Sequence, residues 1–280
     1  MSILSAAPAA PPRTRSDAPF YLGLGVLSGV YILLIVAMLL AQASFTSPHH
    51  LLAALGSAEI RYAIKLSLIS CSMTAILSLW VAVPLGYVLA RFDFPGKSLL
   101  DALLDIPIVL PPLVIGLALL ILFQTPIGQW IENNVISVTF AIPSVILAQF
   151  TVAAAFAIRT MRVTFDQINP RAEQVALTLG CNRGQAFWRV VLPEARRGLI
   201  TAATLAWARS LGEFGPILVF SGATRLRTEV LPTTVFLELS IGNIEAAVAV
   251  SLLMVIAAVI VLVIVRVYGS ENFLGRGAEA

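Results

Sequence analysis

The sequence predicts an all-α membrane protein with six transmembrane helices, and two observations lead to that fold class. First, the chain is 59% hydrophobic and only 12% charged, whereas a soluble domain carries about 25% charged residues. A chain with so little charge cannot cover its surface in water, so the bilayer is its solvent. Second, six apolar runs reach the roughly 20 residues that span a hydrocarbon core: 20–42, 64–90, 103–123, 137–160, 199–220 and 245–267.

The first run is followed by Ala41-Gln42-Ala43, which has the small-residue pattern of a signal-peptidase site. The run is longer than the roughly 7–15 residues of a secretory hydrophobic region, so we predict an uncleaved first membrane helix. Residues 1–19 are rich in alanine and proline, and we predict a disordered cytoplasmic tail there. A second cytoplasmic tail is predicted at residues 269–280, which leaves 20–268 as the transmembrane domain.

Lysine and arginine predict the orientation in the membrane. With the N-terminus inside, thirteen of these residues fall on the cytoplasmic side, four fall outside and Arg209 lies within a span. Positively charged residues concentrate on the cytoplasmic side of membrane proteins, so both termini are predicted to be cytoplasmic. The four outer residues are Arg61, Lys65, Arg225 and Arg227.

The third run contains residues that interrupt a helix. Pro107, Pro111, Pro112 and Gly116 lie in or near its first half, and proline both removes a backbone donor and clashes with the preceding turn. Non-helical backbone at membrane depth survives only inside protein or beside a water-filled cavity. Two interpretations stay open: a kink packed against neighbouring helices, or a break that lines a pathway. Both place this segment inside the bundle.

The predicted cytoplasmic loop 161–198 contains the longest charged segment. Asn169 suits an N-cap, Pro170 the first helical position and Gly180 a C-terminal stop, so a helix of about ten residues is predicted. A second short helix is predicted from Asn182, with Gln185 as its capping partner, ending before Leu192-Pro193-Glu194.

The first of these short helices is predicted to need a partner. Val175, Ala176 and Leu179 are expected to share one apolar face, with Arg171 and Glu173 on other faces. A short helix held between two spans can insert that face into a groove of another protein. The alternative is an interfacial helix that lies on the membrane.

The same loop carries a resemblance to a known family. Glu173-Gln174-Val175-Ala176-x-x-Leu179-Gly180, followed by Val190-x-Leu192-Pro193, resembles the EAA loop of ABC importer permeases. Gln174 and Val175 depart from the general pattern, which has alanines there, although glutamine at the second position resembles the molybdate/sulfate branch. The resemblance implies a type I ABC importer permease fold. It also implies that this helix is a coupling helix, which fits a cleft in a separate ATPase through Glu173, Gln174, Val175, Ala176, Leu179, Gly180, Leu192 and Pro193.

Three further segments resemble the molybdate/tungstate/sulfate permease family. They are Ala90-Arg91-Phe92-x-Phe94-Pro95-Gly96-Lys97, Leu110-Pro111-Pro112-x-Val114-x-Gly116 and Ala208-Arg209-Ser210-Leu211-Gly212-Glu213-Phe214-Gly215. Iron, polyamine and phosphate permeases share the EAA loop but usually lack the last run, and they remain the alternative. The resemblance implies a translocation pathway for molybdate or tungstate first, and for sulfate or thiosulfate next.

The resemblance also implies an assembly. It would be a homodimer in the inner membrane, bound to two ATPase subunits and fed by an external solute-binding protein. ATP and Mg would bind the ATPase, and no cofactor is expected on this chain.

Arg209 and Glu213 are ionisable residues inside the fifth run, where charge is costly and usually paired. Their i,i+4 spacing lets them meet. They are either a structural salt bridge or a device in which Arg209 helps an oxyanion cross while Glu213 tempers its hold. Together with Pro111, Pro112 and Gly116 they are the pathway candidates. Other charged or polar residues of the outer loops are expected to be solvated: His49, His50, Arg225, Arg227, Glu229, Glu238 and Glu245.

Several other functions are disfavoured. Cys71 and Cys181 form no CxxC or Cys/His cluster, so neither a disulfide framework nor a metal site is predicted. Gly96-Lys97-Ser98 ends like a Walker A loop, but Arg91 stands where the first glycine is required. The spans hold no Ser/His, HExxH or carboxylate-pair constellation, so no catalytic residue is assigned. An ion-coupled secondary transporter would show inverted repeats, and none is visible.

Overall fold

The computed structural model describes residues 18–274, and every regular element in that range is a helix. Two units are distinguished: helix α1 (Ala18–Phe45) by itself, and residues 46–274. Helix α1 covers the first predicted run, and Ala18 and Pro19 already belong to it. The remainder of the predicted N-terminal tail, residues 1–17, lies outside the described residues.

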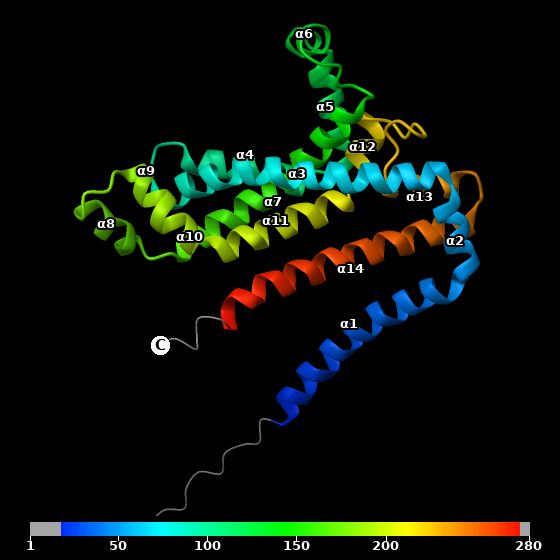
Figure 1. The fold of residues 1–280 in the computed structure, drawn as a ribbon, viewed down its shortest axis with the longest axis horizontal. Helices are drawn as coiled ribbons and strands as arrows, with labels where there is room; N and C mark the ends of the chain where they lie inside the picture. The colour runs from blue at the N-terminus through cyan, green and yellow to red at the C-terminus, as the bar shows by residue number, and fades with distance from the viewer. Residues whose placement is uncertain (1–17, 275–280) are drawn as a thin grey trace, which may run out of the picture. The chain divides into compact units, whose positions relative to one another are not determined.

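Three long helices form the core of the second unit: α3 (Ala58–Arg91), α7 (Ile142–Gln167) and α11 (Arg196–Leu211). They run side by side in Figure 1, and α14 (Ile244–Leu274) packs against α11. Small residues allow the close approach, as membrane helix interfaces require. A Cβ atom on Gly86 of α3 would lie 2.8 Å from the Met161 Cβ of α7, and alanines fill the interior: Ala63, Ala82, Ala153, Ala157, Ala202 and Ala206 are fully buried.

The third predicted run is broken, as its prolines predict. It forms α4 (Lys97–Val109) and α5 (Pro112–Gln124), which are bent by 112° relative to one another. Leu110 has the extended ψ of 142° that a following proline favours. Helix α4 packs on α7, whereas α5 projects away from the core helices and carries α6 (Pro126–Asn134) at its end (Figure 1).

In the fifth predicted run, 199–220, Gly212, Gly215 and Pro216 allow either the close approach of another helix or a helix break, and the structure has the break. The segment forms α11 and the short α12 (Gly215–Phe220), with Gly212–Phe214 between them. Pro216 has no N–H to donate to the Gly212 carbonyl and its ring would clash with that carbonyl in a continuous helix, so α11 ends and a new helix starts with Pro216 in its first turn. Within residues 18–274, four helices are long and apolar enough to span a membrane, or five if the bent α4–α5 pair counts as one. The predicted number of six therefore depends on broken spans.

Several boundaries differ from the prediction because capping residues, not hydropathy, set them. Ser57 caps α3, so this helix begins six residues before the predicted 64. Helix α7 begins at Ile142-Pro143 and runs to Gln167, instead of covering 137–160. Helix α14 continues to Leu274, into the predicted tail 269–280. Two short helices, α2 (Pro48–Gly56) and α13 (Leu231–Ser240), lie in loops that the prediction left unstructured.

The contact between α5 and α12 gives a first testable prediction. A Cβ atom on Gly116 would lie 2.8 Å from the Cα and 2.9 Å from the carbonyl oxygen of Pro216. Gly116→Ala is expected to destabilise the protein by about 1–3 kcal/mol, because backbone atoms cannot yield as a side chain can. Gly212→Ala is the matched control in the same region, since its nearest atom is 3.9 Å away. Equal melting temperatures for the two purified variants would contradict this packing.

Candidate functional site

The predicted coupling helix is present as α8 (Pro170–Thr178). The Asn169 side chain accepts a hydrogen bond from the Arg171 backbone N–H at 3.0 Å, and Pro170 occupies the first helical position. Gly180 has a φ of +92°, the left-handed conformation that ends a helix most easily at glycine. Helix α8 lies at one end of the bundle, where it contacts α9 (Arg183–Ala186) and the π-helical turn η1 (Phe187–Val191) (Figure 1).

The inner face of α8 is attached to the end of α3. The Tyr87 hydroxyl donates to Glu173 Oε1 at 2.5 Å, and Arg91 Nε lies 3.6 Å from Glu173 Oε2. Arg91 also donates to the Ile168 carbonyl at 2.9 Å, so it ties down the chain just before α8. The Arg91 and Glu173 side chains are only 10% and 13% exposed, and Ala176 is buried beside them. Glu173 thus connects the loop to the core helix α3 through a hydrogen bond and an ion pair.

The outer face of α8 consists of different residues from those predicted. The Val175 and Leu179 side chains are 56% and 81% exposed, and Gln174 is exposed. Ala176 does not share this face, so the predicted Val175–Ala176–Leu179 stripe is wrong. Side chains of successive helical residues point in directions about 100° apart. Val175 can therefore be exposed while Ala176, the next residue, is buried.

The second half of the loop is more continuous than predicted. The capping box between Asn182 and Gln185 is confirmed, and it starts α9 (Arg183–Ala186). The helix does not end before Leu192, however. A π-helical turn, η1 (Phe187–Val191), leads into α10 (Leu192–Glu194) and then α11.

This π-turn explains how Pro193 fits within a nearly continuous helical path. The Leu192 N–H donates to the Phe187 carbonyl, the wider spacing of a π-turn. Phe187 packs on Tyr87 with ring centroids 4.8 Å apart, and Trp188 is 67% exposed. Pro193 is exposed and Leu192 half-buried. Sequence reasoning did not assign Tyr87 or Arg91 to this site, because their contacts with Glu173 join segments far apart in the chain. It also did not assign Trp188, which lies in the loop itself.

The pathway candidates lie around the two breaks. Pro111 caps α5 and Pro112 opens it. Gly116 faces Pro216, and a Cβ atom on Gly215 would lie 2.8 Å from the Pro112 Cβ. The break between α4 and α5 therefore meets the break between α11 and α12.

Arg209 and Glu213 lie at the second break. Arg209 Nη1 is 2.6 Å from Glu213 Oε2, and the Glu213 side chain is 1% exposed whereas that of Arg209 is 29% exposed. The guanidinium carbon lies 5.9 Å from the centre of the Phe156 ring on α7, within the range of a cation–π contact. The carboxylate is thus enclosed and the guanidinium is reachable.

Gln149 is a further member of this site that sequence reasoning missed. It is buried on α7, accepts a hydrogen bond from the Thr74 hydroxyl at 3.2 Å and donates to the Ser210 carbonyl at 3.2 Å. Ser210 is in the last turn of α11, and its carbonyl also accepts from the Glu213 N–H at 3.2 Å. Gln149 therefore adds a side-chain hydrogen bond at the end of α11, next to Arg209. The only sequence signal for this residue was that Gln149 is a single glutamine within the apolar run 137–160.

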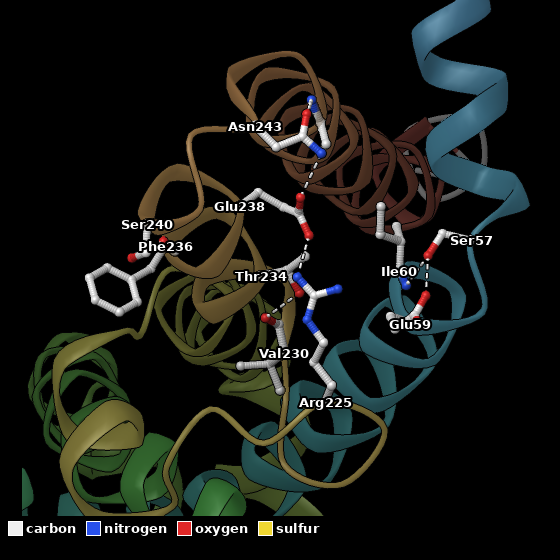
Figure 2. A network of polar contacts seen from close by, with 11 residues as sticks. Ser57, Glu59, Ile60, Arg225, Val230, Thr234, Phe236, Glu238, Ser240 and Asn243 are labelled. Atoms are coloured by element: carbon white, nitrogen blue, oxygen red, sulfur yellow. Dashed lines mark hydrogen bonds and ion pairs between the residues drawn. The ribbon is translucent and has the colours of Figure 1, made fainter.

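The loop before α13 lies at the opposite end of the bundle from α8 (Figure 1). Arg225 and Glu238, predicted to be solvated, form a polar network there (Figure 2). Arg225 Nη2 donates to Glu238 Oε1 at 2.7 Å, and the Asn243 amide donates to Glu238 Oε2 at 2.9 Å. Glu238 and Glu229 are buried, at 5% and 0% exposure. His50 is also placed in a helix, with Nε2 3.2 Å from Glu245 Oε2.

Glu229 gives a second testable prediction. Burial raises the pKa of its carboxyl above the ordinary 4.5, Thr234 and Arg225 lower it in part, and Glu238 and Glu59 raise it. The folded protein then binds more protons than the unfolded one, so stability falls as pH rises from 4.5 to the raised value. Glu229→Gln is expected to remove this loss and raise the melting temperature at neutral pH by the equivalent of about 1–3 kcal/mol. The exposed Glu194→Gln is the control, and identical pH profiles for wild type and Glu229→Gln would refute the prediction.

Comparison with known proteins agrees with this geometry. A family model described as binding-protein-dependent transport system inner membrane component matches residues 82–270. The chain is 37% identical over 208 residues to the molybdate/tungstate transport system permease protein WtpB of Thermococcus kodakarensis, covering 73% of this chain and 79% of the relative. It is 33% identical over 206 residues to the sulfate transport system permease protein CysT of Escherichia coli, covering 73% and 74%.

Solved structures share the fold. The match to a crystal structure of a bacterial ABC transporter involved in the import of the acidic polysaccharide alginate has a TM-score of 0.71 at 19% identity. It covers 94% of this chain and 97% of that one. A crystal structure of a bacterial alginate ABC transporter in complex with an alginate pentasaccharide-bound periplasmic protein has a TM-score of 0.69 at 17% identity. At such identity the likeness establishes the fold alone.

Proposed function

The chain belongs to the family of binding-protein-dependent transport inner membrane components and is the permease subunit of an ATP-binding cassette importer, and we propose that it passes a tetrahedral oxyanion. Molybdate or tungstate is the first candidate, and sulfate or thiosulfate the next. The observation that carries the proposal is the asymmetry of the ion pair in the break after α11. Arg209 is partly exposed while its counter-ion Glu213 is enclosed, so a passing anion meets positive charge first.

The charge of Arg209 is expected to bind an anion weakly, as transport requires. A permeating ion must be held weakly enough to leave, and a lone arginine with a carboxylate at 2.6 Å is a partly neutralised donor. Arginine also presents a planar fork of N–H donors that matches oxyanion geometry. The α5–α12 contact, with Pro111, Pro112 and Gly116, would hold this break in place as part of the pathway wall.

The ATPase is proposed to dock on the outer face of α8 and the turn that follows it. Gln174, Val175 and Leu179 would enter its cleft, because they are exposed and in part apolar. Gly180 ends the helix so that Leu179 can project. Leu192 and Pro193 would hold the second half of the loop in register, while Glu173 and Ala176 fasten the helix to the core. ATP and Mg would bind the ATPase, which places hydrolysis on another chain.

Two further partners complete the proposed assembly in the inner membrane. A second copy of the permease would cover the projecting α5, where Leu113, Val114 and Leu117 are exposed. An external solute-binding protein would deliver the anion at the end that carries the Arg225–Glu238 network. This orientation, with both termini cytoplasmic, is consistent with the excess of arginine and lysine near α8.

The proposed mechanism follows from the attachment of α8 to α3. Closure of the ATPase pair on ATP would bring the two coupling helices together. Because Glu173 is bonded to Tyr87 and near Arg91, that displacement passes directly to a core helix that contacts α7 and α11. ATP-bound and ATP-free ATPase thereby make different contacts with the permease, which is the requirement for coupling.

The test is uptake by the complete transporter in proteoliposomes. The chain is co-expressed with its ATPase and solute-binding protein, and ATP-dependent uptake of labelled molybdate and sulfate is compared with that of ferric iron, putrescine and phosphate. Saturable oxyanion uptake that requires ATP and the binding protein is expected. Uptake of one of the other solutes instead would favour the alternative permease families. Uptake that persists without ATP but collapses with a protonophore would indicate an ion-coupled secondary transporter.

A further inference from the structure

A cavity of about 800 Å³ lies between α4, α7 and α11, close to the coupling loop. Its polar lining comes from two arginines, three threonines, one glutamate and one glutamine: Arg159, Arg197, Thr160, Thr164, Thr201, Glu194 and Gln167. Its remaining walls are largely apolar. Apolar walls lower the local dielectric constant and so strengthen the pull of the arginines on an anion.

The cavity adjoins the charged break described above. Phe156 lines it, and the same ring lies 5.9 Å from the Arg209 guanidinium carbon. Leu205, one helical turn before Arg209 on α11, lines it as well. An anion that leaves Arg209 toward the α8 end of the bundle would therefore reach this cavity next.

The chemistry of the lining suits a tetrahedral oxyanion. The Arg159 side chain is 62% exposed and its Nη2 lies 2.6 Å from Asp105 Oδ2. Only part of its N–H fork is used by that pair, and guanidinium forks bind oxyanions through paired N–H groups. The Thr160, Thr164 and Thr201 hydroxyls donate to the backbone carbonyls four residues before them, but a hydroxyl can rotate to face a ligand.

The cavity is also bounded by both ends of the coupling loop. Ile168 precedes α8, and Glu194 and Arg197 follow the π-turn, and all three line the cavity. A displacement of the loop by the ATPase would therefore change the spacing of the groups that surround the anion. Asp105 pairs with Arg159, and Glu194 adds a negative charge to the lining, so an anion in the cavity would be held weakly enough for release.

We propose that this cavity is a second, low-affinity oxyanion site, through which the anion passes after Arg209 and which the coupling loop opens and closes. Arg159 and Arg197 supply the positive charge. The ion pair between Arg159 and Asp105 forms again in full as the anion leaves. The proposal rests on the proposed oxyanion function. A phospholipid headgroup carries the same oxyanion chemistry and could occupy the same cavity. The experiment below distinguishes the free anion from the headgroup.

The chain contains its own matched control. Arg162, three residues after Arg159 on α7, pairs with Asp101 of α4 at 2.5 Å, just as Arg159 pairs with Asp105. Both arginines tie α7 to α4, but only Arg159 lines the cavity. A structural effect of losing such a tie is therefore expected from Arg162→Gln as well as from Arg159→Gln, whereas an effect on anion binding is expected from Arg159→Gln alone.

The experiment measures protection of a thiol inside the cavity. Thr201→Cys is introduced with Cys181→Ser, since Cys71 is buried. The permease–ATPase complex is held without nucleotide in phosphatidylcholine nanodiscs, and its reaction rate with a neutral methanethiosulfonate reagent is followed as molybdate or sulfate is added. Millimolar anion is expected to slow the reaction. Arg159→Gln should raise the half-protecting concentration about tenfold, Arg162→Gln should leave it unchanged, and Asp105→Asn should lower it.

Several outcomes would contradict the proposal of an oxyanion site in this cavity. Protection that is unaffected by Arg159→Gln, or weakened equally by Arg162→Gln, would show that the cavity holds no oxyanion through Arg159. Protection that appears without added anion when phosphatidylglycerol is included, and disappears with Arg159→Gln, would assign the cavity to a lipid headgroup. If oxyanion uptake is intact but anions give no protection, the site alone is wrong. If uptake also fails, the proposed function is wrong.

Discussion

Leu179→Asp is expected to separate the permease from its ATPase. Leu179 is 81% exposed, the largest exposed fraction among the large apolar residues of the loop that includes α8, and the docking proposal places its side chain in a cleft of the partner. An aspartate there would be an unpaired charge in a desolvated pocket, which costs about 3–5 kcal/mol and weakens binding more than a hundredfold. Co-purification of the ATPase in mild detergent and ATP-dependent uptake are the measurements, and both should be lost.

Glu173→Ala is the informative comparison, because it lies on the other side of the same helix. It removes the hydrogen bond from Tyr87 and the ion pair with Arg91 but leaves the exposed residues unchanged. The ATPase is expected to stay bound while uptake falls, since the loop no longer moves with α3. Glu173→Gln, which keeps an acceptor for Tyr87, should retain more uptake. Loss of the ATPase from Glu173→Ala as complete as from Leu179→Asp would place Glu173 in the interface instead.

The contrast between these two residues illustrates what the sequence could and could not predict. The bounds of α8 were predictable because Asn169, Pro170 and Gly180 act within one helical turn. The face that meets a partner was not, because a small residue such as Ala176 fits either inside or outside. The deciding contact joins Tyr87 to Glu173, 86 positions apart, and no local pattern encodes it.

The membrane spans show the same division. Proline signals predicted the break after Leu110, since the missing donor is a local property. In 199–220 the glycines and Pro216 allow either close helix packing or a break, and only the packed structure decides for the break at Gly212–Phe214. The burial of Glu229 and Glu238 was not predictable either, because polar side chains in a loop are usually solvated and their enclosure depends on helices that assemble around them. Apolar runs and the distribution of charge therefore predict the membrane spans, whereas the burial of individual side chains depends on how the helices pack.

The ion pair of Arg209 and Glu213 gives the second large expected effect. Arg209→Leu leaves the carboxylate of Glu213 buried and without its partner, which is expected to cost about 3–5 kcal/mol and lower the yield of folded protein. Glu213→Leu should cost less, because the Arg209 side chain is 29% exposed and keeps its contact with the Phe156 ring. Melting temperatures of the purified permease–ATPase complex measure both effects.

The double variant Arg209→Leu/Glu213→Leu separates the two roles that the pair can have. It removes both charges together, so its stability is expected to return close to that of the wild type. If the pair only holds the break together, oxyanion uptake should return with stability. If Arg209 meets the anion, uptake should stay low in a folded complex whose ATPase still binds, and the concentration dependence of uptake should change. We expect the second result, because the enclosed carboxylate and reachable guanidinium present one charge to the pathway, whereas a purely structural pair would gain nothing from that exposure.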